Sequence, residues 1–134
     1  MTEGDPWAAY ERLVARDPTE LTNAECRLVA LGSLRTELNN GGFDQYFFNS
    51  AGDLAVVALE GAGAVGADGL ADLLGRALEV LNVPDPSNRD SRQEALDTAE
   101  EDKFEELDRE YLALEASTDL DSVMRDVMES ADTP

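Results

Sequence analysis

The 134-residue sequence contains no histidine, one cysteine and one lysine. Without histidine it lacks the side chain that most often acts as a general base and that commonly binds zinc. The single Cys26 cannot form an internal disulfide. No apolar run approaches the roughly 20 residues that span a bilayer, and the N-terminus lacks the basic and apolar stretches of a signal peptide. These absences predict a cytoplasmic protein with no metal and no membrane partner.

Positive charge is also scarce. Thirty Asp and Glu oppose ten Lys and Arg, which gives a formal net charge of -20, and most of that charge lies in residues 67–134. Repulsion between carboxylates and phosphates argues against direct binding of nucleic acid and favours a basic protein partner. A compositional bias or salt adaptation would also produce acidity, but it would spread the carboxylates over every solvated face.

Apolar residues recur at helical spacing along the whole chain, and no pair of alternating strands is visible. Thr22 followed by Glu25 is a capping-box pattern that opens one helix, and Asn39 to Gly42 is typical of its end. We therefore predict an all-α fold of about six to seven helices in one domain, 1–134. Within it we expect a helical core over 1–83, a proline-containing linker over 84–92 and an acidic helical segment over 93–134.

The acidic segment predicts one long helix from about Arg92 to Ala116. Its apolar stripe would dock on the core, and its other faces carry almost only carboxylates. The helix length is close to one turn of B-DNA, roughly 34–36 Å, so the carboxylates could stand in for phosphates. A merely solvated face is the competing interpretation. The candidate partner-binding residues are Asp97, Glu101, Asp102, Glu105, Glu106, Asp108 and Glu115.

Two motifs that resemble ligand sites do not support one. Gly61 to Gly66 fits the dinucleotide pattern G-x-G-x-x-G, but the βα units that this fold needs are absent, so we interpret it as a hinge between helices. Asp85 to Asp90 lacks the glycine and the final glutamate of a calcium loop. We assign no catalytic, cofactor-binding or metal-binding residue and predict that the protein is not an enzyme.

One contiguous stretch is far more specific. Residues 37–53 read ELNNGGFDQYFFNSAGD, and this string resembles the signature of a bacterial family of domains of unknown function whose best-known member is a DNA-mimic protein (DMP). The resemblance implies an all-helical, acidic, non-enzymatic protein that binds a DNA-binding transcriptional regulator. We interpret the motif as a structural junction. Its residues are Asn40, Gly41, Gly42, Phe43, Tyr46, Phe47, Asn49 and Asp53. Of these, Asn49 would satisfy backbone groups at a helix end and Asp53 would cap the next helix.

Three functional hypotheses remain open at this point. The first is a DNA mimic, monomeric or homodimeric, that blocks a basic transcription factor. The second is an immunity or antitoxin-like inhibitor of a basic nuclease toxin. The third is an adaptor domain whose acidity is only compositional. Reversing the charge of the acidic segment separates the first two from the third, because only binding to a basic partner would be lost.

Overall fold

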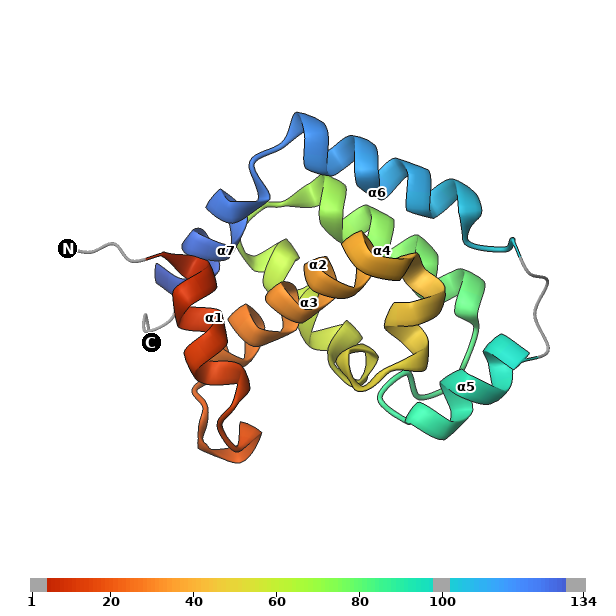
Figure 1. Cartoon of the computed structure of the whole chain (residues 1–134), viewed down its shortest axis with the longest axis horizontal. Coiled ribbons are helices and arrows are strands. Elements are labelled where there is room, and N and C mark those ends of the chain that lie inside the picture. The colour runs from red at the N-terminus through yellow and green to blue at the C-terminus, as the bar shows by residue number, and fades with distance from the viewer. Residues whose placement is uncertain (1–4, 98–101, 130–134) are drawn as a thin grey trace.

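The computed structural model describes residues 5–97 and 102–129. Within these residues the chain forms seven α-helices, two short 3₁₀ helices and no strand (Figure 1), so the all-α prediction is confirmed. The α-helices are α1 (Pro6–Val14), α2 (Asn23–Phe48), α3 (Ala55–Ala64), α4 (Asp68–Leu81), α5 (Arg89–Asp97), α6 (Glu105–Ser117) and α7 (Leu120–Glu129). The 3₁₀ helices are η1 (Pro18–Glu20) and η2 (Ser50–Leu54).

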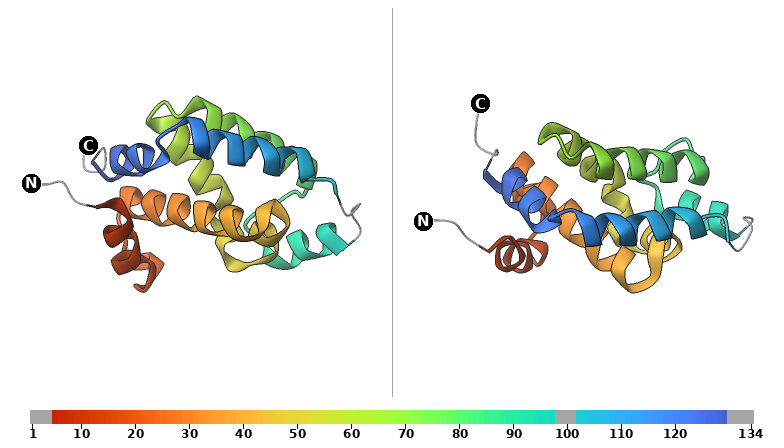
Figure 2. Two further views of the ribbon diagram at one scale, coloured as in Figure 1. Left: turned by 45° about the horizontal axis from the view of Figure 1, so that its top comes forward. Right: turned by 90° about the horizontal axis from the view of Figure 1, so that it is seen from above.

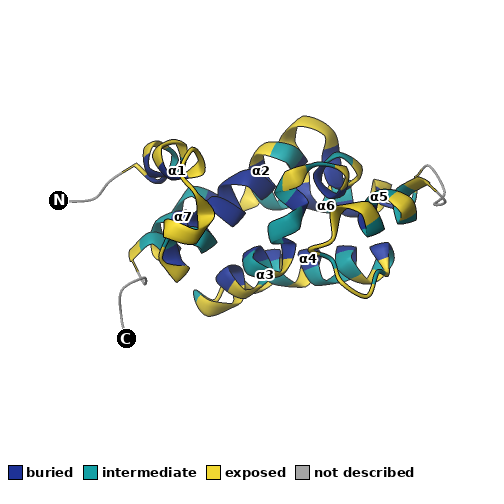
Figure 3. Ribbon diagram, turned by 90° about the horizontal axis from the view of Figure 1, so that it is seen from below, coloured by how far each residue is buried: buried dark blue, intermediate teal, exposed yellow. Residues whose placement is uncertain are grey.

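Helix α2 is the centre of the molecule and contacts α1, α3, α5, α6 and α7. In Figures 1 and 2, α1 and α7 lie side by side at one end, α5 lies at the other, and α6 runs along α4. Buried positions line the faces that the helices turn toward one another (Figure 3), and the aromatic residues Phe43, Tyr46, Phe47, Phe104 and Tyr111 are almost completely buried among leucines. One continuous core therefore joins the described α-helices, and α5 contributes to it through the half-buried Ala95 and Leu96.

The capping box at the start of α2 is confirmed. The backbone N–H of Glu25 donates to Thr22 Oγ1 at 3.1 Å, and the backbone N–H of Thr22 donates to Glu25 Oε1 at 2.9 Å. Each side chain satisfies a backbone group that the first helical turn leaves without a partner.

The expected end of this helix at Asn39–Gly42 becomes a kink inside α2. Gly42 has φ 77° and ψ -169°, while helical residues continue on both sides of it as far as Phe48. The freed backbone N–H of Phe43 donates to Asp108 Oδ1 on α6 at 2.9 Å. The kink turns the second part of α2 so that Phe43 and Phe47 stack at 5.9 Å between their ring centroids, against Phe104.

The single long helix predicted from Arg92 to Ala116 is wrong. Helix α5 ends at Asp97, residues 102–104 form a turn, and α6 begins at Glu105. In a straight helix Arg92 and Phe104 would lie about 18 Å apart along the axis and about 120° apart around it. Both side chains instead reach Phe47: Arg92 Nε donates to its carbonyl at 2.8 Å, and the rings of Phe104 and Phe47 lie 5.5 Å apart. Because both Arg92 and Phe104 contact Phe47, the chain between them cannot be one straight helix. Helix α5 also begins at Arg89, inside the segment expected to be a linker.

Candidate functional site

The predicted partner-binding carboxylates separate into an exposed group and an internal group. Asp102, Glu105 and Glu106 are exposed around the start of α6, and we call these three residues the α6 acidic edge. Asp97 is exposed at the end of α5, and Glu101 lies outside the described residues. Of the predicted carboxylates, those that are exposed therefore lie at the junction of α5 and α6, while the acidic segment carries further exposed carboxylates at Asp119, Asp126 and Glu129.

Asp108 and Glu115 belong to the internal group. Asp108 is half-buried and accepts the Phe43 N–H, and its burial raises its pKa despite that hydrogen bond. Glu115 accepts two hydrogen bonds from Arg35, at 2.9 and 2.8 Å. The sequence held a signal for this difference, because residues 108 and 115 lie one helical turn after Phe104 and Tyr111 on the apolar stripe. Both carboxylates serve the fold, so we leave them out of the surface proposed below.

The helix itself favours negative charge at the α6 acidic edge. Glu105, Glu106 and Asp108 occupy its first turn, where the aligned peptide dipoles leave a partial positive charge. Arg109 forms an ion pair with Glu105 at 3.6 Å, and because both side chains are exposed the pair adds little to stability. The helix therefore tolerates the edge, whose basic neighbours are Lys103 and Arg109.

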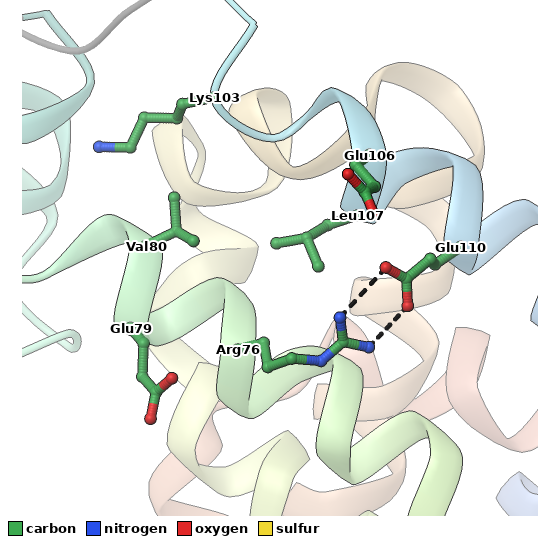
Figure 4. A pocket seen from close by; sticks show the side chains of 7 residues that line it. All are labelled: Arg76, Glu79, Val80, Lys103, Glu106, Leu107 and Glu110. Carbon is green, nitrogen blue, oxygen red and sulfur yellow. Dashed lines mark hydrogen bonds and ion pairs between the residues drawn. The ribbon is translucent and has the colours of Figure 1, made fainter.

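A groove of about 430 Å³ extends the α6 acidic edge toward α4 (Figure 4). Val80 and Leu107 form its apolar part, and the carboxylates of Glu79 and Glu106 lie on opposite sides of it. The groove is lined by Arg76, Glu79, Val80, Lys103, Glu106, Leu107 and Glu110. This arrangement can hold the aliphatic stem of a long basic side chain while its charged end reaches a carboxylate.

Arg76 fixes the two walls of the groove. Its guanidinium donates to both carboxylate oxygens of Glu110, at 2.6 and 3.1 Å, and to Asp72 one turn earlier on α4, at 3.0 Å. The hydrogen bonds from Arg76 hold the pKa of Glu110 below its ordinary value. Besides the Arg76–Glu110 pair, the charged groups of this groove are the carboxylates of Glu79 and Glu106, which would attract a basic partner, and the ammonium of Lys103.

The signature residues surround a buried arginine that the sequence did not single out. Arg92 is fully buried and donates to the carbonyl oxygens of Phe47, Asn49 and Pro86, at 2.8, 3.0 and 2.5 Å. It also donates to Asp53 Oδ1 at 2.7 Å. We call these contacts the Arg92 clasp. Most of its acceptors are backbone carbonyls, which leave no trace in the sequence.

The Arg92 clasp revises two expectations about the signature. Asp53 does not cap a helix: its carboxylate binds Arg92 and Arg89, and the N-cap of α3 is Leu54 without a side-chain hydrogen bond. Asn49 makes no side-chain cap either, because its amide donates to Glu37 at 3.1 Å. A Cβ atom at residue 52 would lie 2.6 Å from the Tyr46 carbonyl oxygen and 3.0 Å from Arg92 Nε, so the close packing beside the clasp explains glycine there. Asn40 and Gly41 are exposed beside the kink.

Residues 19–129 match the model of the DMP19-like protein family, from η1 to the end of α7. The chain belongs to the DMP19-like family. This match covers both the signature and the α6 acidic edge, and membership points to a DNA-mimic protein. No curated protein and no solved structure shows significant similarity to the chain. Helix α1 lies outside the part that the family defines.

Neither a metal cluster nor a membrane segment is found in the described part of this DMP19-like protein. In residues 5–97 and 102–129 no three Asp, Glu or Cys side chains are grouped so that they could hold a metal ion. None of the described helices is long and apolar enough to cross a membrane.

A second buried arginine ties the ends of the DMP19-like fold together. Arg35 on α2 donates to Glu115 on α6 and, at 2.7 Å, to Asp121 on α7. Trp7 on α1 donates its indole N–H to Asp121 at 2.9 Å, and its ring lies 5.1 Å from the Arg35 guanidinium. Four helices thus meet at one cation.

This cluster makes stability depend on pH. Burial acts to raise the pKa of Glu115, but hydrogen bonds from Arg35, Tyr111 and Asn39 bring it below its ordinary value. The hydrogen bond from Arg35 lowers the pKa of Asp121. Carboxyls with a lower pKa in the folded state stabilise it above their unfolded pKa, near pH 4, and lose that contribution as pH falls through the folded pKa. We expect the free energy of unfolding to include a component that disappears below about pH 4.

Urea denaturation between pH 7 and pH 3 tests this expectation. Protonation also relieves repulsion among the exposed carboxylates, which opposes the loss. The comparison with Glu115→Gln isolates the cluster, because that variant cannot titrate at residue 115. It should be less stable at pH 7 and should lose less stability on acidification than the wild type. If both proteins lose the same free energy of unfolding between pH 7 and pH 3, Glu115 is not the group responsible.

Proposed function

We propose that this protein is a non-enzymatic DNA mimic that acts in the cytoplasm by covering the basic surface of a DNA-binding transcriptional regulator. The observation that carries the proposal is the α6 acidic edge: three exposed carboxylates at one helix end in a DMP19-like chain of net charge -20. Lysine and arginine side chains that normally contact phosphates would contact Asp102, Glu105 and Glu106. Such a complex associates fast and weakens with salt, because exposed charges drive it.

The break between α5 and α6 changes the form of the mimicry. Helix α6 has 13 residues, so it is about 20 Å long, well short of a full turn of DNA. Its acidic edge is a compact patch that continues into the α4–α6 groove through Glu106 and Glu79. We infer that one group of phosphate-binding side chains is covered at a time, and not a row that follows a whole DNA turn.

Charge reversal tests the proposal. The variant Asp102→Lys/Glu105→Lys/Glu106→Lys should lose at least about tenfold in affinity for the regulator and should show a shallower dependence on salt. Its matched control, Glu11→Lys/Glu20→Lys/Glu60→Lys, makes the same change in net charge at exposed positions on other elements. The control should bind nearly as tightly as the wild type. Affinity capture from lysate at low salt finds the partner, and titration of the purified pair measures binding.

The decisive readout is competition with DNA. The wild-type protein should displace a regulator from its DNA duplex, and added duplex should release the regulator from the wild-type protein. Capture of a nuclease whose activity is blocked would support the immunity hypothesis instead. If the edge variant and the control bind the same partner equally, the acidity is compositional and the mimic proposal fails.

A further inference from the structure

Phe48 is exposed in the middle of an otherwise buried signature. It is the one aromatic side chain of the described residues that is classed as exposed, with 53% of its surface accessible. Helix α5 is joined to the backbone at this residue, because Gln93 donates its side-chain amide to the Phe48 carbonyl at 2.8 Å. Beside it lies a hollow of about 500 Å³, lined by Phe48, Gln93, Glu94, Leu96 and Asp97, which we call the Phe48 hollow.

The Phe48 hollow combines an apolar floor with a negative rim. Phe48 and the half-buried Leu96 supply the apolar surface, and both charged residues that line the hollow are acidic. Asp97 lies in the last described turn of α5, so its carboxylate adds negative charge to the same rim as Glu94. The local potential therefore favours a cation close to an apolar group.

These features select among possible occupants. A second copy of this chain would bring another net charge of -20 to an acidic rim, so charge disfavours it. A neutral apolar segment would bring no positive charge to the carboxylate of Asp97. A basic amphipathic helix, with an apolar side chain flanked by lysine or arginine, complements both parts of the hollow.

We propose that the Phe48 hollow is an anchor site for an apolar side chain on a basic amphipathic helix of the partner. The basic character of that partner rests on the proposed function. Aromatic anchors carry a large share of the binding energy at protein interfaces, whereas exposed charges mainly set association rate and salt dependence. A phosphate backbone offers no such anchor. The hollow would therefore let this protein discriminate between partners that a row of charges alone would bind alike.

Two synthetic peptides test the anchor. One is an amphipathic helix of leucine and lysine, and the other keeps the lysines but has glutamine in place of leucine. Fluorescence anisotropy should show that the wild type binds the leucine peptide more tightly. Phe48→Ser should weaken binding of that peptide about tenfold while leaving its salt dependence and the binding of the glutamine peptide unchanged. Leu112→Ser is the matched control, because Leu112 is 54% exposed on α6, outside the hollow, and it should behave as the wild type.

The outcomes separate the anchor from the proposed function. If Phe48→Ser and Leu112→Ser bind the leucine peptide equally, the anchor proposal is overturned, and the charge proposal stands if reversal at the α6 acidic edge still reduces binding. If binding of both peptides is insensitive to that reversal and to salt, the proposed function fails whatever Phe48 does. Amide shifts of Gln93 and Leu96 on titration with the leucine peptide would support the location, and unchanged shifts would contradict it.

Discussion

Replacement of Arg92 by methionine is expected to lower the free energy of unfolding by about 3–5 kcal/mol, the range found when one partner of a buried ion pair is removed. The guanidinium is completely buried, and its loss leaves three backbone carbonyls without their donor and leaves Asp53 with Arg89 as its remaining cation. Methionine fills part of the volume, so the effect reports on hydrogen bonding more than on a cavity. Urea denaturation at neutral pH measures it.

Arg89→Met is the matched control for this experiment. Arg89 binds the same carboxylate, at 2.7 Å from Asp53 Oδ2, but its side chain is 48% exposed. Water can replace its hydrogen bonds, so its removal should change stability little. Equal losses in the two variants would show that the Arg92 clasp contributes no more than a surface ion pair.

Gly42→Ala is expected to lower the free energy of unfolding by about 2–4 kcal/mol, from backbone strain and the loss of one buried hydrogen bond. The combination of φ 77° and ψ -169° is accessible almost only to glycine. A Cβ atom at this position would also lie 2.6 Å from Asp108 Oδ2, so the carboxylate that accepts the Phe43 N–H would have to move.

Gly75→Ala provides the comparison for Gly42. Gly75 lies inside α4, and a Cβ atom there would meet nothing within 4 Å. Alanine is favoured over glycine in a helix interior, so this variant should gain about 0.5–1 kcal/mol. Chemical denaturation of both variants tests the pair. If Gly42→Ala is as stable as the wild type, the kink does not require glycine.

The sequence predicted the features that depend on neighbouring residues. The capping box of Thr22 and Glu25 spans three positions, and the tendency of Asn39 to Gly42 to interrupt a helix is a local backbone property. The signature string identified the family before any geometry was known, and the match over residues 19–129 confirms it.

Features that depend on distant contacts were not predictable in the same way. Apolar residues on both sides of residue 100 keep a helical period. The local pattern therefore gave no indication that α5 and α6 are separate helices that both pack on Phe47. The sequence did not distinguish Arg92 from the solvated arginines. Its acceptors are mostly backbone carbonyls, which every residue type has. Glu115 had a local signal in its place one turn after Tyr111, but its partner Arg35 lies 80 residues away and had none.

The contacts of α2 also determine when the chain can complete its fold during synthesis. The Phe43 N–H donates to an acceptor that lies 65 residues later in the chain. The indole N–H of Trp7 donates to an acceptor that lies 114 residues later. Domains form from the N-terminus as the chain emerges from the ribosome, but contacts with such separation cannot close until the C-terminal part is free. The signature segment is therefore translated early and stabilised last. A nascent chain that ended in α5 would hold the kink glycine without Asp108, and Arg35 without either of its carboxylates.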